Sequence, residues 1–347
     1  MEPKIISLGV AAPQYAYSQQ QVFDALQYPR PFWRIFRDSG INARQFCIPI
    51  ERIRCLSFQE QQEVYRDQAT ALSQQAIINC LDGRSVHDIG CLVFCSCTGF
   101  APGPTIGHYL AKELGLARDV SITNISSMGC ESGGFPGLRR AADFVKTTGR
   151  QALVVSCELC SLTYYPETGI DPANDYELLR ANAVFGDFAS AALVGTDTDP
   201  RHPCIVDSES YTETGYLGDL GYAWSNGRLR VLLSKRVPAR ATEVSAKAIT
   251  SVLARHDLGP EGVAFWVIHA GGMKILDMIA QELGFPEHRL ESSREFLRAH
   301  GNCSSATVGG VAKMLMQTAT PHEGDYLAVV TVGPGMTGGC TLLRFEQ

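Results

Sequence analysis

The sequence predicts an α/β fold built from two similar halves, and three observations support this prediction. Short, continuous apolar runs such as IGCLVFCSC and QALVVSCEL are typical of strands that are buried on both faces. Segments with apolar residues at helical spacing follow such runs in both halves, and this alternation is typical of parallel or mixed sheets. A polar stretch near residues 196–204 separates the halves.

The N-terminal half begins with a predicted strand over Lys4 to Val10 and a polar helix start near Ser18. A glutamine-rich helix is predicted from about Ser57 to Leu81, and the turn signal Asp82-Gly83 ends it. The elements expected next are the strand IGCLVFCSC, the loop TGFAPGPT, the helix IGHYLAKELGL, the strand VSITNIS, a tight turn over 127–130, a helix over about 132–147, and the strands QALVVSCEL and FASAALVGT.

The C-terminal half repeats the pattern of buried strand, small-residue turn and helix. The elements expected there are a helix from about Thr242 to His256, the strand VAFWVIHA, the helix MKILDMIAQELG, a helix that begins near Asn302, and the hairpin YLAVVTVGPGMTGGCTLLRF.

Composition excludes several classes of protein. The 347 residues include 30 Lys+Arg and 36 Asp+Glu, so the net charge of −6 argues against a general nucleic-acid binder. With 45% hydrophobic and 19% charged residues, global disorder is not expected. No apolar run approaches the ~18–20 residues of a membrane span, and the N-terminus is a poor signal peptide. We therefore expect a cytoplasmic protein with no membrane partner.

Twelve cysteines are the unusual feature of the composition. In a long cytoplasmic chain this number does not indicate a disulfide framework, and several lie in apolar runs where a thiol packs as a small hydrophobe. The pairs Cys95/Cys97 and Cys157/Cys160 lack a second pair at zinc spacing, so no metal site is expected.

Cys130, in MGCESGGFPGLRRA, is the first candidate for chemistry. It lies between a predicted strand and a glycine-rich helix start, where free backbone N–H groups favour a thiolate and lower its pKa. A buried structural cysteine at a tight junction is the equally weighted alternative.

Three further motifs follow. His269, in FWVIHAGGMKILD, leaves a buried strand into a glycine turn, although a lone histidine is more often a core or surface residue. Asn302, in AHGNCSSATVGG, by itself fits a helix N-cap. The motif TVGPGMTGG by itself fits an ordinary hairpin turn. A cysteine, a histidine and an asparagine together are the residue types that thioester chemistry needs.

These motifs resemble those of the thiolase superfamily, and specifically of the chalcone-synthase-like (type III) polyketide synthases. The stretches that carry the resemblance occur in family order over nearly the whole chain and are MGCESGGFPGLRRA, VVSCELCSLTY, VFGDFASAALVG, LLSKRVP, FWVIHAGGMKILD, HGNCSSATVGGVAKML and TVGPGMTGG. The resemblance implies a duplicated, layered α-β-α-β-α architecture with mixed five-stranded sheets. Residues 1–200 would carry the nucleophilic cysteine, and residues 201–347 the histidine and asparagine.

The resemblance also implies the reaction. Cys130 would accept an acyl starter, and His269 and Asn302 would polarise the malonyl thioester carbonyl so that decarboxylation yields an enolate. The enolate would attack the Cys130 thioester, and the product would then cyclise. The backbone N–H of Cys130 and the loop Gly333-Pro334-Gly335 would hold the oxyanion. Coenzyme A thioesters are the substrates, and no cofactor is required.

Other family positions carry over less directly. Phe185 matches the aromatic gate between the coenzyme A tunnel and the cavity, and Val231 matches a second gate position where plant enzymes usually have Phe. The positions that would line the cavity are Cys97, Thr98, Cys160, Thr163 and Ser304. Cys97 and Cys160 replace hydroxyl side chains that are common in plant enzymes. Phe188 stands where the motif usually reads GDG, and Tyr222 stands where plant enzymes usually have Gly.

Arg34 and Arg37 resemble the segment that contacts coenzyme A phosphates, and Lys274 follows the histidine turn. Solvated helix faces are the alternative for all three. The resemblance implies a homodimer with acyl-CoA and malonyl-CoA as substrates. The alternative function is a stand-alone ketosynthase, similar to synthase III, that joins carrier-protein-bound β-ketoacyl chains and releases a pyrone. A third alternative is a degenerate member that only binds acyl thioesters.

Overall fold

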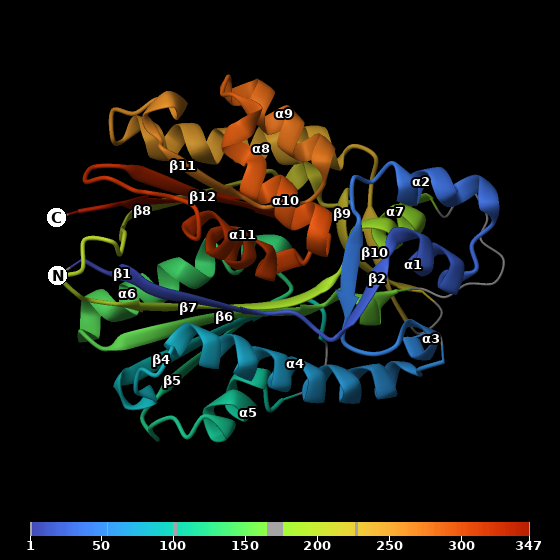
Figure 1. Cartoon of the computed structure of the whole chain (residues 1–347), viewed down its shortest axis with the longest axis horizontal. Coiled ribbons are helices and arrows are strands. Elements are labelled where there is room, and N and C mark those ends of the chain that lie inside the picture. The colour runs from blue at the N-terminus through green and yellow to red at the C-terminus, as the bar shows by residue number, and fades with distance from the viewer. Residues whose placement is uncertain (1, 54, 100–102, 165–175, 226–227, 347) are drawn as a thin grey trace.

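A computed structural model describes residues 2–53, 55–99, 103–164, 176–225 and 228–346, and it has the predicted α/β fold (Figure 1). The strands are β1 (Lys4–Ala11), β2 (Tyr15–Ser18), β3 (Ala43–Phe46), β4 (Ile89–Ser96), β5 (Ser121–Ser126), β6 (Gln151–Leu159), β7 (Asp187–Gly195), β8 (Cys204–Thr212), β9 (Leu220–Ser225), β10 (Arg228–Leu233), β11 (Phe265–Ile268), β12 (Tyr326–Gly333) and β13 (Thr337–Arg344).

The α-helices are α1 (Gln19–Leu26), α2 (Trp33–Arg37), α3 (Ile50–Ile53), α4 (Phe58–Leu81), α5 (Ile106–Glu113), α6 (Pro136–Thr148), α7 (Tyr176–Val184), α8 (Val237–Ala254), α9 (Met273–Leu283), α10 (Glu291–His300) and α11 (Thr307–Met316). The 3₁₀ turns are η1 (Arg30–Phe32), η2 (Val86–Asp88), η3 (Gly129–Glu131), η4 (Cys160–Thr163), η5 (Thr214–Tyr216), η6 (Pro260–Gly262), η7 (Glu287–Leu290) and η8 (Ser304–Ala306).

The prediction of separate five-stranded sheets is wrong. Within the described residues, nine strands form one mixed sheet in the order β11-β12-β13-β8-β1-β7-β6-β4-β5. Five of these strands belong to the first half and four to the second. The two sets are joined where β1 of the first half pairs with β8 of the second. Its junction with β8 is narrow, because only Lys4 pairs with Cys204 and two backbone hydrogen bonds flank that pair. Such pairing between distant segments leaves no trace in local periodicity.

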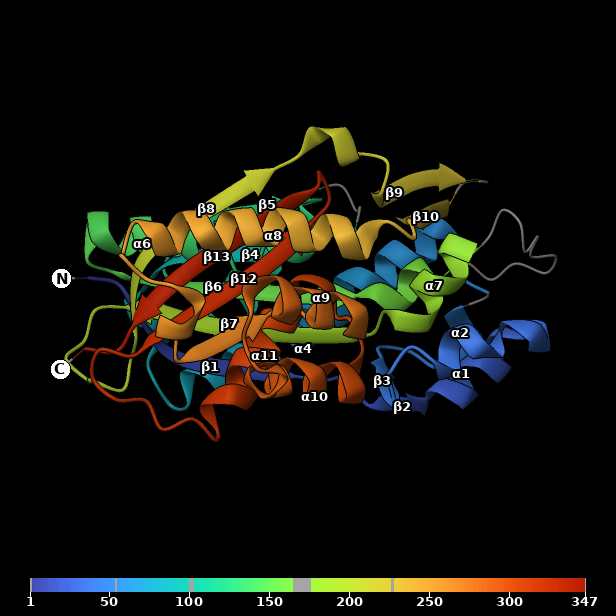
Figure 2. The ribbon, with the colours of Figure 1, turned by 90° about the horizontal axis from the view of Figure 1, so that it is seen from above.

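The layers of the fold are visible in Figure 1 as helices, strands, helices, strands and helices from top to bottom. Helices α6 and α11 lie in the middle layer, and their apolar residues share one buried cluster with strands from both halves, including Val154 and Val329. Helix α4 packs on the outer face of β1 and β7, and α8 packs on β13 and β8. The termini lie at one end of the molecule, and α1, α2, α7 and the hairpin β9–β10 lie at the other (Figure 2).

Local sequence explains where helix α4, the predicted glutamine-rich helix, begins and ends. The side chain of Ser57 accepts a hydrogen bond from the Glu60 backbone N–H, and the Glu60 side chain accepts one from the Ser57 N–H, which is a capping box. Asp82 ends α4 in the left-handed conformation, with φ +47°.

Three other helices begin at residues that differ from the predicted ones. Helix α6 begins at Pro136 rather than Ser132, and α8 begins at Val237 rather than Thr242. The helix expected near Asn302 begins with the turn η8 at Ser304 and continues as α11. Within the described part of the chain, no helix is long and apolar enough to cross a membrane.

Candidate active site

The turn that carries Cys130 requires glycine. Strand β5 ends at Ser126. Ser127 (φ +62°) and Gly129 (φ +67°), the first residue of η3, both adopt left-handed conformations. A Cβ atom on Gly129 would lie 2.3 Å from Pro334 Cδ, so the C-terminal loop packs directly on this turn. Cys130 itself is 7% exposed.

The pKa of the Cys130 thiol differs from the expectation. Burial raises this pKa to about 12, and a hydrogen bond with Ser304 opposes the rise. The prediction of a lowered pKa is therefore wrong for the chain as described, because η3 is a single short turn and the loss of solvation outweighs its dipole. The thiol is neutral near pH 7.

His269 is a buried, neutral histidine at the end of β11. It is 2% exposed, and burial lowers its pKa to about 4. Its backbone N–H donates to the Val330 carbonyl at 2.8 Å, which fixes the turn, while Nδ1 has no hydrogen-bond partner. A buried ring nitrogen without a partner is available to a ligand.

Asn302 is held by its backbone and by its side chain. It forms a parallel β-bridge with Phe185, in which the Asn302 N–H donates to Val184 O at 2.8 Å and the Gly186 N–H donates to Asn302 O at 3.0 Å. Its Oδ1 accepts from the Ser304 N–H at 2.9 Å, but the N-cap of η8 is Cys303, so Asn302 lies one residue before the cap position that the structural alternative gave it.

A chain of contacts joins the three candidates. Ser304 interacts with the Cys130 thiol and lowers its pKa, and the Ser304 N–H donates to Asn302 Oδ1. Asn302 Nδ2 donates to Gly271 O at 3.3 Å, and a Cβ at Gly271 would lie 3.4 Å from His269 Nε2. Cys130 from one half of the chain is thus linked, through Ser304 and Asn302, to the turn after His269 in the other half.

The loop Gly333-Pro334-Gly335 connects β12 to β13 at this point. A Cβ on Gly333 would lie 2.5 Å from Met128 O and 3.1 Å from Glu131 Cγ. The absence of a side chain therefore allows the loop to contact the cysteine turn.

Two of the predicted cavity residues, Cys97 and Ser304, interact with the Cys130 thiol. Cys97 Sγ is 3.2 Å from Ser304 Oγ, the Thr98 hydroxyl donates to Glu158 at 2.9 Å, and the Thr163 hydroxyl donates to Cys160 O at 2.8 Å. All five predicted positions are buried. Tyr222 OH lies 3.4 Å from Cys97 Sγ, so the phenol occupies this wall.

Glu158 is a site residue that sequence reasoning missed. It is fully buried on β6, and burial raises its pKa. Its carboxyl accepts hydrogen bonds from Ser305 Oγ at 2.5 Å, from the Cys97 N–H at 3.1 Å and from Ser96 Oγ at 3.2 Å. The signal was available, because a glutamate inside an apolar strand is unusual unless its carboxyl is used.

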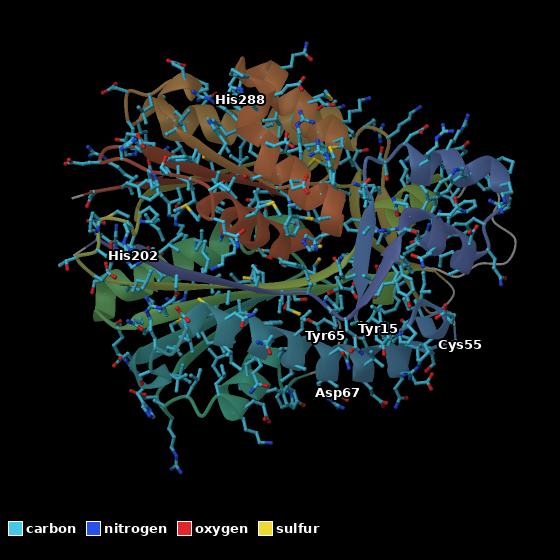
Figure 3. All side chains as sticks on the ribbon, viewed as in Figure 1. Tyr15, Cys55, Tyr65, Asp67, His202 and His288 are labelled. Carbon is cyan, nitrogen blue, oxygen red and sulfur yellow. The ribbon has the colours of Figure 1, made fainter. Side chains whose placement is uncertain are left out.

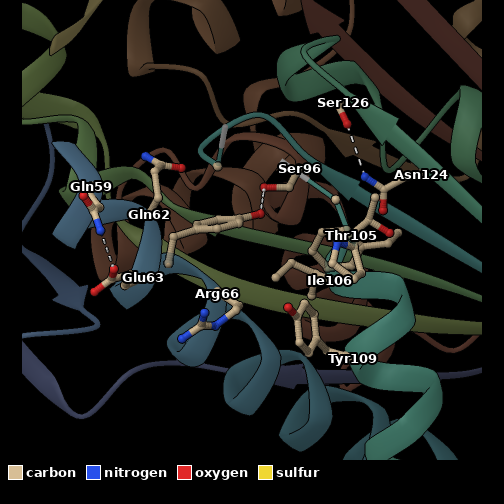
Figure 4. Close-up of a pocket in the computed structure, with 15 residues that line it drawn as sticks. Gln59, Gln62, Glu63, Arg66, Ser96, Thr105, Ile106, Tyr109, Asn124 and Ser126 are labelled. Carbon is tan, nitrogen blue, oxygen red and sulfur yellow. Dashed lines mark hydrogen bonds between the residues drawn. The ribbon is translucent and has the colours of Figure 1, made fainter. Parts of the chain in front are cut away.

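A separate pocket of about 360 Å³ approaches the Glu158 network from outside, between α4, α5 and β5 (Figure 4). Ser96 contributes to its wall and hydrogen-bonds the Tyr65 hydroxyl at 2.7 Å. Polar side chains such as Gln62 and Asn124 line other parts of the pocket, together with apolar ones such as Phe94 and Ile106.

The two gate positions are both buried in the cluster on the α4 side of the fold. Phe185 is 7% exposed and Val231 is 5% exposed. Val231 lies directly opposite Tyr222 in the β9–β10 hairpin. Phe188 packs edge-on against Phe296 at 5.1 Å between ring centroids, so it fills the middle layer beside the sheet.

The three basic residues do not form one cluster of free charges. Arg34 donates to the Tyr176 hydroxyl at 3.3 Å, and Arg37 pairs with Asp38 at 2.7 Å. Lys274 is exposed in the first turn of α9.

All twelve cysteines are free, and Cys55 is exposed at the periphery of the molecule (Figure 3). No group of three or more His, Cys, Asp or Glu side chains suited to a metal ion occurs in the part of the chain that the structure describes.

Comparison with known proteins identifies the family. The N-terminal domain of chalcone and stilbene synthases matches residues 50–198, and the C-terminal domain of these enzymes matches residues 223–345. The chain belongs to the chalcone and stilbene synthase family. The structure also matches the crystal structure of 1,3,6,8-tetrahydroxynaphthalene synthase from Streptomyces coelicolor A3(2), a bacterial type III polyketide synthase. The TM-score is 0.88 at 26% identity, and 99% of each chain is covered.

Two relatives of this chalcone and stilbene synthase family member are named as synthases. The 1,3,6,8-tetrahydroxynaphthalene synthase of Streptomyces peucetius subsp. caesius is 30% identical over 90% of this chain and 83% of the relative. The phloroglucinol synthase of Pseudomonas fluorescens is 28% identical over 94% of this chain and 95% of the relative. The predicted fold family and activity are confirmed: the chain is a type III polyketide synthase, an acyltransferase that performs decarboxylative condensation.

Proposed function

We propose that Cys130 carries the growing acyl chain. The contact chain from Cys130 through Ser304, Asn302 and Gly271 to His269 is the observation that supports this assignment. Because the thiol and the imidazole are both neutral, the proton moves only during the attack. His269 accepts it as the Cys130 sulfur bonds to the thioester carbonyl, and the departing coenzyme A sulfur takes it when its C–S bond breaks.

Decarboxylation is the second step of the proposal. His269 and Asn302 Nδ2 donate hydrogen bonds to the carbonyl oxygen of a malonyl thioester, and the enolate forms as carbon dioxide leaves. Loss of one such donor typically costs ~3–4 kcal/mol of barrier, or about 10²–10³ in rate. The enolate carbon then attacks the Cys130 thioester, while the Cys130 N–H and the Gly333-Pro334-Gly335 loop stabilise the oxyanion. The bond between the acyl carbon and the Cys130 sulfur breaks as the oxyanion collapses, which frees the cysteine and leaves the extended chain on coenzyme A.

Coenzyme A thioesters reach the site past Phe185 and Val231 in this proposal. Arg34, Arg37 and Lys274 are the proposed phosphate contacts, and Arg37 would have to exchange its exposed partner Asp38 for a phosphate. Acyl-CoA and malonyl-CoA are the proposed donors, with an acyl carrier protein as the alternative.

A polyhydroxylated aromatic compound is the proposed product. The relatives named for tetrahydroxynaphthalene and for phloroglucinol support this class. Tyr222 beside Cys97 also favours a compact cavity, since the phenol occupies space next to the cysteine wall.

The proposed organisation keeps the two halves, residues 1–200 and 201–347, and adds a homodimer in the cytoplasm. Among the described residues, the last strand of the first half ends at Gly195 and the first strand of the second half begins at Cys204, on either side of the proposed boundary. Strand β5 supports the dimer, because it is an edge strand of the described sheet and carries the uncharged sequence SITNIS. Free thiols throughout suit a reducing compartment.

Incubation with malonyl-CoA alone, then with a panel of acyl-CoAs and acyl carrier proteins, tests the proposal. We expect an acyl adduct on Cys130 by peptide mass spectrometry, none in Cys130→Ala, and a condensed product. The absence of an adduct from every donor would reject the role of Cys130. Turnover with carrier-bound donors only would instead favour the ketosynthase alternative.

A further inference from the structure

Arg44 is a charged side chain that none of the steps above uses. It lies on β3 and is completely buried. The guanidinium lies within 6.0 Å of the ring centroids of Phe36, Phe46 and Tyr164. A buried cation is costly unless its N–H groups are well satisfied, so its partners indicate what it holds in place.

These partners are neutral oxygens, and two of them are carbonyls at the C-terminal end of α7. Nη1 donates to Asn182 O at 2.7 Å, to Phe185 O at 2.9 Å and to the Tyr164 hydroxyl. Nη2 donates to Gln19 Oε1. The Tyr164 hydroxyl itself donates to Phe185 O, so two buried donors meet at the carbonyl of the gate residue.

The aliphatic part of Arg44 packs against two glycines. A Cβ on Gly301 would lie 3.0 Å from Arg44 Cγ and Cδ, and one on Gly186 would lie 3.5 Å from Arg44 Cβ and Cγ. These glycines flank the bridge between Phe185 and Asn302 on its two strands.

Arg44 therefore contacts both sides of the bridge that positions Asn302. One side is the segment after α7, which the guanidinium fixes through its carbonyls. The other is the segment before η8, which the stem supports at Gly301. The Asn302 N–H bonds Val184 O, which lies between the two carbonyls that Arg44 holds.

We propose that Arg44 is a positioning residue for decarboxylation, which sets the Asn302 amide and the Phe185 ring through the buried bridge. This inference rests on the role proposed for Asn302. Arginine can hold this bridge because its planar guanidinium donates hydrogen bonds to several oxygens at fixed angles. A lysine ammonium cannot reproduce that geometry.

The experiment measures two rates in each variant. The first is decarboxylation of malonyl-CoA to acetyl-CoA, in which the C–C bond breaks, carbon dioxide leaves and the enolate takes a proton from solvent. The second is alkylation of Cys130 by iodoacetamide, which requires the thiol but no hydrogen bond from Asn302 Nδ2 to a substrate. We expect Arg44→Lys to lower decarboxylation about tenfold and to leave alkylation within about twofold.

A double variant separates positioning from general damage. In an Asn302→Ala background, Arg44→Lys should lower decarboxylation by less than about twofold further, because both changes act on the same group.

Arg294→Lys is the matched control. Arg294 is also buried, but it pairs with Asp277 at 2.7 Å away from the bridge. It should leave both rates near those of the unmodified protein. Tyr164→Phe removes one donor to Phe185 O and should give the same pattern with a smaller loss, so it serves if Arg44→Lys does not fold.

Two results would overturn the inference. Equal losses from Arg44→Lys with and without Asn302, or a parallel loss of Cys130 alkylation, would show that Arg44 does not act through Asn302. If Asn302→Ala itself leaves decarboxylation unchanged, the proposed function fails and the inference fails with it. A decarboxylation loss that appears only with Asn302 present supports the inference.

Discussion

Cys97 Sγ lies 3.2 Å from Ser304 Oγ, although 207 residues separate them in the sequence. Ser304 also interacts with the Cys130 thiol and lowers its pKa, so this residue connects the cavity wall to the nucleophile. Cys97 directly follows β4, whereas Cys130 lies in η3 and Ser304 in η8, and the packing of the two halves around α6 and α11 brings them together.

The first prediction concerns the reactivity of Cys130. Because burial raises its pKa to about 12, only the neutral thiol is populated near pH 7. Alkylation of Cys130 by iodoacetamide should therefore rise about tenfold per pH unit from pH 7 to pH 10, without a plateau. Ser304→Ala removes a hydrogen bond that lowers this pKa, so alkylation should slow by about 3–10-fold.

Peptide mass spectrometry checks the rates at Cys130 and separates them from the exposed Cys55. Cys55→Ala is the control and should leave the Cys130 rate unchanged. A plateau below pH 8 would contradict the prediction, since it would indicate a resting ion pair with His269.

The second prediction concerns Glu131, the buried neighbour of the nucleophile. Its Oε2 has no hydrogen-bond partner, and burial alone raises its pKa to about 8. The folded state thus prefers the protonated carboxyl. Its contribution to stability is complete below pH 4.5 and is lost as pH rises through about 8. Glu131→Gln should consequently flatten the fall in stability between pH 5 and pH 9.

Denaturant unfolding at pH 5 and pH 9 measures this effect. The exposed Glu51→Gln is the matched control and should keep the pH dependence of the unmodified protein. An unchanged pH slope in Glu131→Gln would show that Glu131 gains a partner in solution.

The third prediction concerns Phe188, the bulky departure from the family motif. Its ring contacts Phe296 and His300, with centroids at 5.1 and 4.9 Å. Phe188→Ala leaves a cavity in the middle layer and should lower the free energy of unfolding by about 3–5 kcal/mol. Phe58→Ala, on a partly exposed ring, should cost less. Equal losses in the two variants would indicate that the middle layer collapses to fill the space.

The sequence predicted the parts of the site that local motifs mark. Cys130, His269 and Asn302 each follow or precede a small-residue turn at the end of a buried element, and family order connected them. Glu158 and Arg44 were missed for different reasons. Glu158 carried a signal, as a charge in an apolar strand, whereas Arg44 lies in a polar stretch and is buried only because distant segments cover it.

The single nine-stranded sheet was also beyond local reasoning. Each strand could be recognised from its apolar run, but the pairing of Lys4 with Cys204 joins the two halves through residues 200 positions apart. The raised pKa of Cys130 has a similar origin, because the Pro334 loop and η8 remove solvent from a turn that by itself favours a thiolate.

The fourth prediction concerns the second gate position. Val231 lies opposite Tyr222, whose hydroxyl is 3.4 Å from Cys97 Sγ. A larger side chain at Val231 should therefore narrow the cavity beside Tyr222 and Cys97. Val231→Phe should lower kcat/KM for acyl-CoA starters of about eight carbons or more on the order of tenfold relative to acetyl-CoA, because only the longer chains need that space. Leu217→Phe, on a side chain that is 66% exposed, is the control and should not discriminate. Equal losses for short and long starters in Val231→Phe would show that Val231 supports the hairpin without lining the passage.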